Sequence, residues 1–154
     1  MRLDRVWIER NIPHHGRMCL LDEVIEWDAR HIQCRGSTHR ALDHPLRSQG
    51  RLGIACGIEY AAQAMAVHGA LAGGVSAQGT CAGRSEAGFL ASLREVRLHV
   101  LRLDDIEIDL ISQAELIAGN RESALYEFAL TSGAQRLLSG RATVVFDANT
   151  RSNP

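Results

Sequence analysis

The chain of 154 residues contains no lysine, so all 17 of its basic residues are arginine. This absence excludes a Schiff-base mechanism and a lysine nucleophile. Acidic residues slightly outnumber basic ones, and the formal net charge is −1. Because a general nucleic-acid binder needs a positive excess, we expect no nucleic-acid partner.

Cysteine is scarce, and the patterns that bind metals are missing. The four cysteines are widely spaced and form no CxxC pair, and the seven histidines form no HxH or HxxxH pair. We therefore expect no metal site. The plain interpretation of the cysteines is that they are reduced, partly buried thiols of a cytosolic protein.

Long apolar runs are also lacking. The first residues, "MRLDRVWIERNIP", carry charges throughout and have no apolar core of the kind that a signal peptide needs. No apolar stretch approaches the length of a membrane span. We expect a soluble protein of the cytoplasm with no membrane partner.

What the chain does contain is a regular alternation of segments and turns. Hydrophobic periodicity predicts a short helix over 3–10, with Leu3, Val6 and Trp7 on one side, and a long helix over 52–72. The predicted strands are 19–27, 31–39, 90–103, 106–112, 126–130 and 140–147. The Gly- and Ser-rich segment 73–88 has no hydrophobic period, so we expect it to be mobile or functional.

This order of elements limits the possible folds. Short turns between the late strands imply antiparallel pairing. There are too few helices for a doubly wound parallel sheet. We predict an α+β fold in which a curved antiparallel sheet wraps around one long central helix. It forms a single domain over residues 1–147, followed by a disordered C-terminal tail over 148–154.

The long helix is rich in alanine, and Glu59 is its one charged residue. Glu59 and Gln63 are four residues apart and share a face with small side chains, which leave room for a ligand or for close packing. A carboxylate in an apolar setting needs hydrogen bonds, or its pKa rises. A carboxylic acid with a raised pKa is a good proton donor. Alternatively, Glu59 pairs with an arginine such as Arg47 or Arg51.

Four stretches carry a resemblance to a known family. They are Pro13-His14, "LLDEV" (20–24), "HPLR" (44–47) and "EYAAQAMA" (59–66). Together they resemble the hotdog-fold 3-hydroxyacyl-[acyl-carrier-protein] dehydratases of fatty acid synthesis. The closest similarity is to a divergent branch associated with aryl polyene and polyketide-like biosynthesis. The resemblance implies a hotdog fold for the whole domain.

The resemblance also implies roles for particular residues. In the family a histidine removes the C2 proton of the acyl chain, and the helix glutamate, here Glu59, assists departure of the hydroxyl. His44 is the nearest match to that base, although the Gly- and Pro-rich frame of the family loop is absent here, and His39 is an alternative. Gln63 matches the family glutamine in the substrate site. His14 matches a histidine that braces the loop, and we expect it to belong to the substrate-binding residues.

The family site lies across a dimer interface, with the histidine from one subunit and the glutamate from the other. The resemblance therefore implies a homodimer or a hotdog heterodimer. It also implies acyl carrier protein as a partner and phosphopantetheine as the carrier of the substrate, with no other cofactor. Arg47 and Arg51 either belong to a solvated loop or bind the phosphopantetheine or the acidic carrier protein.

Three functions remain open. The first is a dehydratase that acts on a carrier-bound 3-hydroxyacyl thioester. The second is a thioesterase of the same fold, in which the helix carboxylate activates water. The third is a non-catalytic hotdog subunit that pairs with an active homologue.

Overall fold

The computed structural model of the chain describes residues 2–73 and 88–146. The two α-helices are α1 (Arg5–Asn11) and α2 (Gly57–Ala72). The strands are β1 (Glu23–Trp27), β2 (His31–Gly36), β3 (Gly88–Leu98), β4 (Leu110–Gly119), β5 (Ser123–Ser132) and β6 (Gln135–Phe146). Short 3-10 helices precede β1 (η1, Gly16–Met18), follow β2 (η2, Thr38–Arg40) and lead into α2 (η3, Ile54–Cys56).

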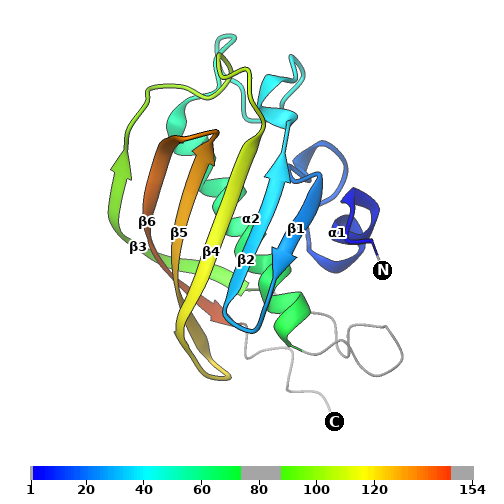
Figure 1. Cartoon of the computed structure of the whole chain (residues 1–154), viewed down its shortest axis with the longest axis vertical. Coiled ribbons are helices and arrows are strands. Elements are labelled where there is room, and N and C mark those ends of the chain that lie inside the picture. The colour runs from blue at the N-terminus through cyan, green and yellow to red at the C-terminus, as the bar shows by residue number, and fades with distance from the viewer. Residues whose placement is uncertain (1, 74–87, 147–154) are drawn as a thin grey trace.

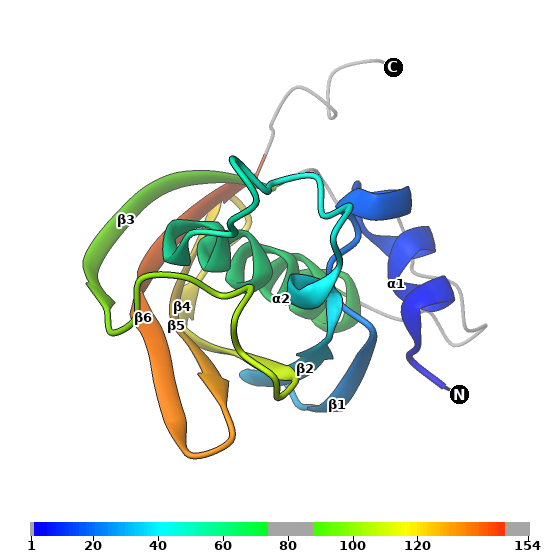
Figure 2. The same cartoon turned by 90° about the horizontal axis from the view of Figure 1, so that it is seen from above.

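The six strands form one antiparallel sheet in the order β1-β2-β4-β5-β6-β3. Figure 2 shows that this sheet curves around α2, with β3 on one side of the helix and β1 on the other. Figure 1 shows α1 beside β1, at the opposite edge of the sheet from β3. The predicted curved antiparallel sheet around one long helix is therefore confirmed.

Small residues bring α2 close to the sheet. Ala61 and Ala64 are fully buried against it. At the start of the helix, a Cβ on Gly57 would lie 2.5 Å from Leu138 Cδ2 and 2.9 Å from Leu130 Cδ2. The alanine-rich sequence thus serves close packing of the helix on the concave face of the sheet.

The predicted strand ends differ from the observed ones most clearly in the second half of the chain. We predicted a strand over 106–112, but residues 106–109 precede β4, which continues to Gly119. β2 and β5 pair with β4 on its two sides and support this longer strand. The predicted turn after β5 is confirmed, and Gly133 adopts there the positive φ of +57° that favours glycine.

The short N-terminal helix is confirmed, and its predicted apolar face is confirmed in part, because Leu3 and Trp7 pack against the core but Val6 does not. Asp4 caps α1 by accepting a hydrogen bond from the Trp7 N–H at 3.1 Å. Ile8 is the residue that α1 buries, whereas Val6 is 56% exposed. α1 ends at Asn11, before Pro13, as the sequence predicts.

Several sequence-based predictions concern residues outside the described part of the chain. These are nearly all of the segment 73–88, the tail 148–154 and Cys81. The other three cysteines are free: Cys19 and Cys34 are buried and Cys56 is half-buried.

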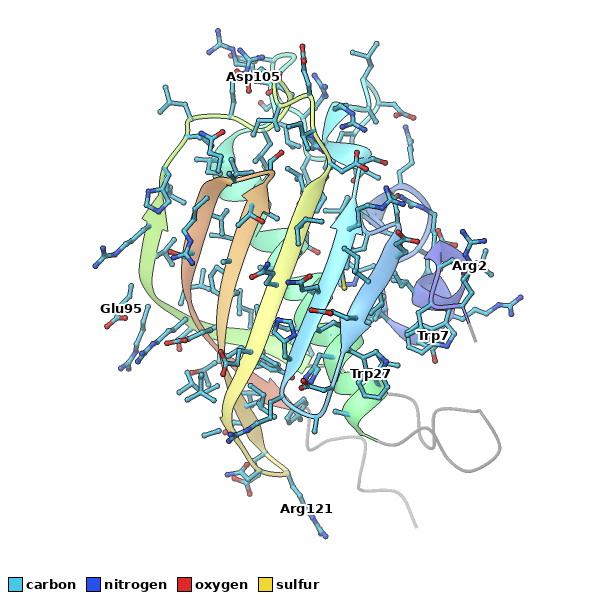
Figure 3. All side chains as sticks on the ribbon, in the orientation of Figure 1. Arg2, Trp7, Trp27, Glu95, Asp105 and Arg121 are labelled. Carbon is cyan, nitrogen blue, oxygen red and sulfur yellow. The ribbon has the colours of Figure 1, made fainter. Side chains whose placement is uncertain are left out.

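None of the described helices combines the length and apolar character required to cross a bilayer. Figure 3 shows Glu95 on β3 and Arg121 beyond the end of β4 pointing outward.

Candidate active site

A buried amide ties α2 to the segment that leads into β1. Gln63 is fully buried, and its Nε2 donates to the Met18 carbonyl at 2.7 Å. Its Oε1 accepts from the Leu20 N–H at 2.9 Å. These two contacts establish the positions of the oxygen and the nitrogen of the Gln63 amide. The Leu20 N–H requires an acceptor, and the Met18 carbonyl requires a donor.

The same amide holds Glu59, one helical turn earlier. The second N–H of Gln63 Nε2 donates to Glu59 Oε1 at 3.1 Å. His14 Nε2 lies 2.8 Å from that same oxygen. The Glu59 side chain is 30% exposed and His14 is 27% exposed, so the pair lies at the edge of the core rather than deep inside it.

The hydrogen bond from His14 decides the protonation of Glu59. It is the largest influence on the carboxyl and lowers the pKa of Glu59 below its ordinary value of 4.5, against desolvation, which acts in the opposite direction. Glu59 is therefore ionised near neutral pH. A raised pKa for Glu59 and a pairing with Arg47 or Arg51 were both wrong, because the partner within the chain is His14.

The protons on the pair can be assigned from the contacts. An ionised carboxylate only accepts, so His14 carries a proton on Nε2 and donates it to Glu59 Oε1. His14 Nδ1 is buried and has no hydrogen-bond partner in the structure. Among the described residues, Glu59 Oε2 accepts no hydrogen bond. Oε2 is therefore the open atom of the pair.

His44 does not contact Glu59 within the chain. It is 5% exposed, and its Nδ1 accepts a hydrogen bond from the Leu46 N–H at 3.1 Å. Its Nε2 lies 3.2 Å from the Tyr60 hydroxyl. Desolvation lowers the pKa of His44 below its ordinary value of 6.5, so the ring is neutral. Both ring nitrogens are occupied, and the assignment of His44 as general base stays a prediction.

Two more histidines are fully buried. His39 Nε2 bonds to the Ile106 carbonyl at 2.9 Å. His68 bridges the Tyr126 hydroxyl at 2.8 Å and the Asp28 carbonyl at 3.0 Å. His68 is thus a buried, hydrogen-bonded histidine of α2. Neither His39 nor His68 has a contact with Glu59 among the described residues.

We expect these buried histidines to make the fold sensitive to acid. Desolvation lowers the pKa of His39, His44 and His68 below 6.5. The unfolded chain then binds protons that the folded chain does not, so the free energy of unfolding falls as pH drops below about 6.5. Each histidine contributes at most about 1.4 kcal/mol per pH unit.

Urea unfolding at pH 7.5 and at pH 5.5 measures this effect, and equal midpoints at the two pH values would contradict it.

The two arginines of the expected substrate site lie in different surroundings. Arg47 Nε donates to the Ala41 carbonyl at 2.8 Å and its Nη1 to the Gly50 carbonyl at 3.1 Å, and its side chain is 13% exposed. Arg47 therefore braces its own loop. Arg51 is exposed, and its side chain forms no ion pair among the described residues. Of the two, Arg51 is the one free to meet a phosphate.

A cavity of about 160 Å³ lies near the site, next to the turn that follows His14. Its lining consists of Arg5, Gly16, Arg17, Thr38, Ala41, Asp43, His44 and Pro45. The lining does not include Glu59 or Gln63, so this cavity is not a slot beside the carboxylate. No group of three or more His, Cys, Asp or Glu side chains in the described ranges could hold a metal ion.

Sequence reasoning found Glu59 and Gln63 but missed two polar residues next to them. Tyr60 is fully buried, and its hydroxyl lies 2.7 Å from Thr38 Oγ1. No spacing or motif in the sequence pointed to either residue. The one available signal was a tyrosine directly after Glu59 in a helix predicted to pack against a sheet, since a tyrosine hydroxyl buried there requires a partner.

Comparisons with known proteins agree with this architecture. A chain of the dehydratase heterocomplex ApeI:P from Xenorhabdus doucetiae is 25% identical, with a TM-score of 0.79 over 93% of this chain and 92% of that one. Zebrafish thioesterase superfamily member 2 is similar in fold, with a TM-score of 0.59 and 15% identity over 93% and 95% of the two chains. The PaaI protein of the Escherichia coli phenylacetic acid degradation operon has a TM-score of 0.58 and 8% identity, over 92% and 88%.

No curated protein sequence matches this chain. The fold is the hotdog fold of these dehydratases and thioesterases, as the sequence predicted. A model of the ApeP-like family, described as ApeP dehydratase, matches residues 6–152, almost the whole chain. The chain belongs to the ApeP-like dehydratase family.

Proposed function

We propose that the protein eliminates water from a 3-hydroxyacyl thioester carried on acyl carrier protein, in aryl polyene or related acyl-chain synthesis. The observation that carries this proposal is the Glu59–His14 pair, in which an ionised carboxylate is held at one oxygen and open at the other. Membership of a dehydratase family supports the same reaction class.

The pair supplies the proton transfer that the reaction needs. Glu59 Oε2 takes a proton from C2 of the acyl chain, and the electrons of that C–H bond form the C2–C3 double bond as the C3–O bond breaks. The hydroxyl then leaves with the proton as water, and Glu59 is again ionised. The N–H of His14 keeps the carboxylate oriented through Oε1. In the scheme implied by the resemblance, His44 of a partner subunit is the base instead.

The start of α2 suits the thioester carbonyl. η3 leads directly into this helix, whose first N–H, that of Gly57, donates to carbonyls of η3. The Ala55 N–H of η3 has no acceptor among the described residues, and Glu59 is in the first turn of α2. Backbone N–H groups at a helix N-terminus stabilise developing negative charge on an oxygen. We propose that the N–H of Ala55, at the joint helix start formed by η3 and α2, polarises the thioester carbonyl while Glu59 removes the neighbouring proton, and that Arg51 meets the phosphate of the phosphopantetheine arm.

Mass spectrometry of the purified protein incubated with a 3-hydroxyacyl carrier protein tests the reaction. A loss of 18 Da from the acyl chain, which is the mass of one water, supports dehydration. Release of the free acid supports the thioesterase alternative, which an ionised Glu59 could serve by activating water. An unchanged substrate, converted only after a second hotdog subunit is added, supports the non-catalytic role.

We further propose that the protein pairs with a second hotdog chain through β3, either its own copy or a different dehydratase subunit. Among the described strands, β3 pairs with β6 alone, so one edge of this 11-residue strand is open. It exposes Phe89, Leu90, Leu93 and Leu98. A long apolar edge strand is an aggregation site unless another chain covers it. The similarity to a dehydratase heterocomplex supports such pairing.

A charge on this edge should abolish the pairing. We expect Leu93→Glu to convert dimers into monomers, measured by light scattering after size-exclusion chromatography, with the second hotdog chain present if pairing requires it. Leu101→Glu is the matched control, because Leu101 is 90% exposed and lies outside the strand. A Leu93→Glu protein that remains dimeric would exclude β3 as the interface.

A further inference from the structure

A chain of buried and half-buried hydrogen bonds connects His44 to the segment that Gln63 ties to Glu59. Its direction follows from the contacts. Because the Leu46 N–H donates to Nδ1, neutral His44 carries its proton on Nε2 and donates it to the Tyr60 hydroxyl. Thr38 Oγ1 donates to the Leu20 carbonyl at 2.8 Å, so the Tyr60 hydroxyl donates to Thr38 at 2.7 Å.

Leu20 is where this chain meets the candidate active site. Its carbonyl accepts from Thr38, and its N–H donates to Gln63, which in turn donates to Glu59. The side chains of Thr38 and Gln63 therefore bind the carbonyl and the N–H of Leu20, respectively. The segment they hold continues back through η1 to His14, the second group that bonds to Glu59 Oε1.

Packing at Gly36 keeps this arrangement tight. A Cβ at Gly36 would lie 3.1 Å from the Leu20 carbonyl oxygen and 3.3 Å from Tyr60 Cε1. The Tyr60 ring and the Leu20 backbone thus press against the end of β2, where no side chain separates them. The hydroxyl of Tyr60 is thereby kept in reach of Thr38.

We propose that Tyr60 is a positioning residue for the Glu59–His14 pair. Its hydroxyl completes the chain from His44 through Thr38 to Leu20, and so fixes the segment that brings His14 to Glu59 Oε1 and orients the Gln63 amide toward the same oxygen. The inference rests on the proposed function, since it assigns Tyr60 a part in the reaction. Tyr60 acts through this segment and has no contact with Glu59 Oε2 among the described residues.

The molecule provides a matched control for the hydroxyl. Tyr126 is also a buried tyrosine whose hydroxyl bonds to a buried histidine, His68, near the other end of α2. Tyr60→Phe and Tyr126→Phe remove the same atom from similar surroundings. Both variants should lose comparable stability, but only Tyr60→Phe should alter the site.

Titration of the Glu59 carboxyl by ¹³C NMR is the first measurement. His14 is the titratable group in contact with Glu59, and Gln63 is its uncharged partner. We expect the pKa of Glu59 to move upward toward 4.5 in Tyr60→Phe and to stay at the wild-type value in Tyr126→Phe. An unchanged pKa in Tyr60→Phe, or equal changes in both variants, would overturn the proposal.

Kinetics give the second measurement. We expect kcat for water loss to fall about tenfold in Tyr60→Phe, with KM nearly unchanged, because the reacting groups are misplaced while binding is kept. Tyr126→Phe should keep the wild-type kcat, and a similar fall in that variant would contradict a specific role for Tyr60. If the wild-type protein removes no water, the proposed function fails, but the NMR titration still decides whether Tyr60 positions Glu59.

Discussion

Replacing Glu59 by glutamine should lower kcat/KM for water loss by about 10³-fold, which corresponds to about 4 kcal/mol of transition-state stabilisation. The amide keeps the size of the side chain and an oxygen that can accept from His14 and Gln63. It cannot take a proton from C2 at the position of Oε2. The loss should therefore appear in kcat, with KM within about twofold of the wild-type value.

The pH dependence of the wild-type enzyme should agree with this result. The hydrogen bond from His14 lowers the pKa of Glu59, so the base is ionised at neutral pH and becomes protonated only below 4.5. Activity should therefore fall on the acid side as pH drops through that lowered pKa. Glu26→Gln is the control, because Glu26 is an exposed carboxylate on β1. Full activity in Glu59→Gln would exclude Glu59 as the group that moves the proton.

The sequence predicted the parts of the fold that depend on local pattern. The long helix, the six strands and the turn at Gly133 follow from periodicity and turn residues. The extension of β4 beyond residue 112 could not be predicted in this way, because four of its seven residues, Ala114, Glu115, Ala118 and Gly119, have little preference for strands. Pairing with β5 on one side extends the strand through them. The position of β3 beside β6, at the edge of the sheet, likewise depends on pairing between distant segments.

The candidate site was predictable only where it depends on local pattern within one helix. Helical spacing placed Glu59 and Gln63 on one face, and their contact at 3.1 Å confirms this. The partner of Glu59 comes from a loop 45 residues earlier, and hydrophobic periodicity does not predict which helix a distant loop contacts. Sequence therefore favoured an arginine as the partner, whereas the structure places His14 there.

The contacts of Gln63 in the structure indicate a role in addition to the substrate binding that the resemblance implied. The resemblance implied that it binds substrate, a role that stays a prediction. Within the chain its amide is fully buried and contacts Met18, Leu20 and Glu59. The observed contacts support a role in holding the N-terminal segment, and with it His14, against α2.

Replacing Gln63 by leucine should therefore reduce both stability and activity. Leucine fills a similar volume but leaves the buried Leu20 N–H and the Met18 carbonyl without their partners. Each lost partner costs about 1–3 kcal/mol, so the free energy of unfolding should fall by roughly 3 kcal/mol. Because Glu59 also loses one of its two donors, kcat should fall by about 10²-fold.

Urea unfolding and steady-state kinetics measure these two effects on the same preparation. Gln113→Leu is the matched control. It makes the same chemical change at a half-exposed glutamine on β4, away from Glu59. A stable Gln63→Leu protein with reduced kcat would assign Gln63 to the reaction rather than to the fold. A stable and fully active variant would contradict both parts, since the buried amide would then hold neither the segment nor the carboxylate.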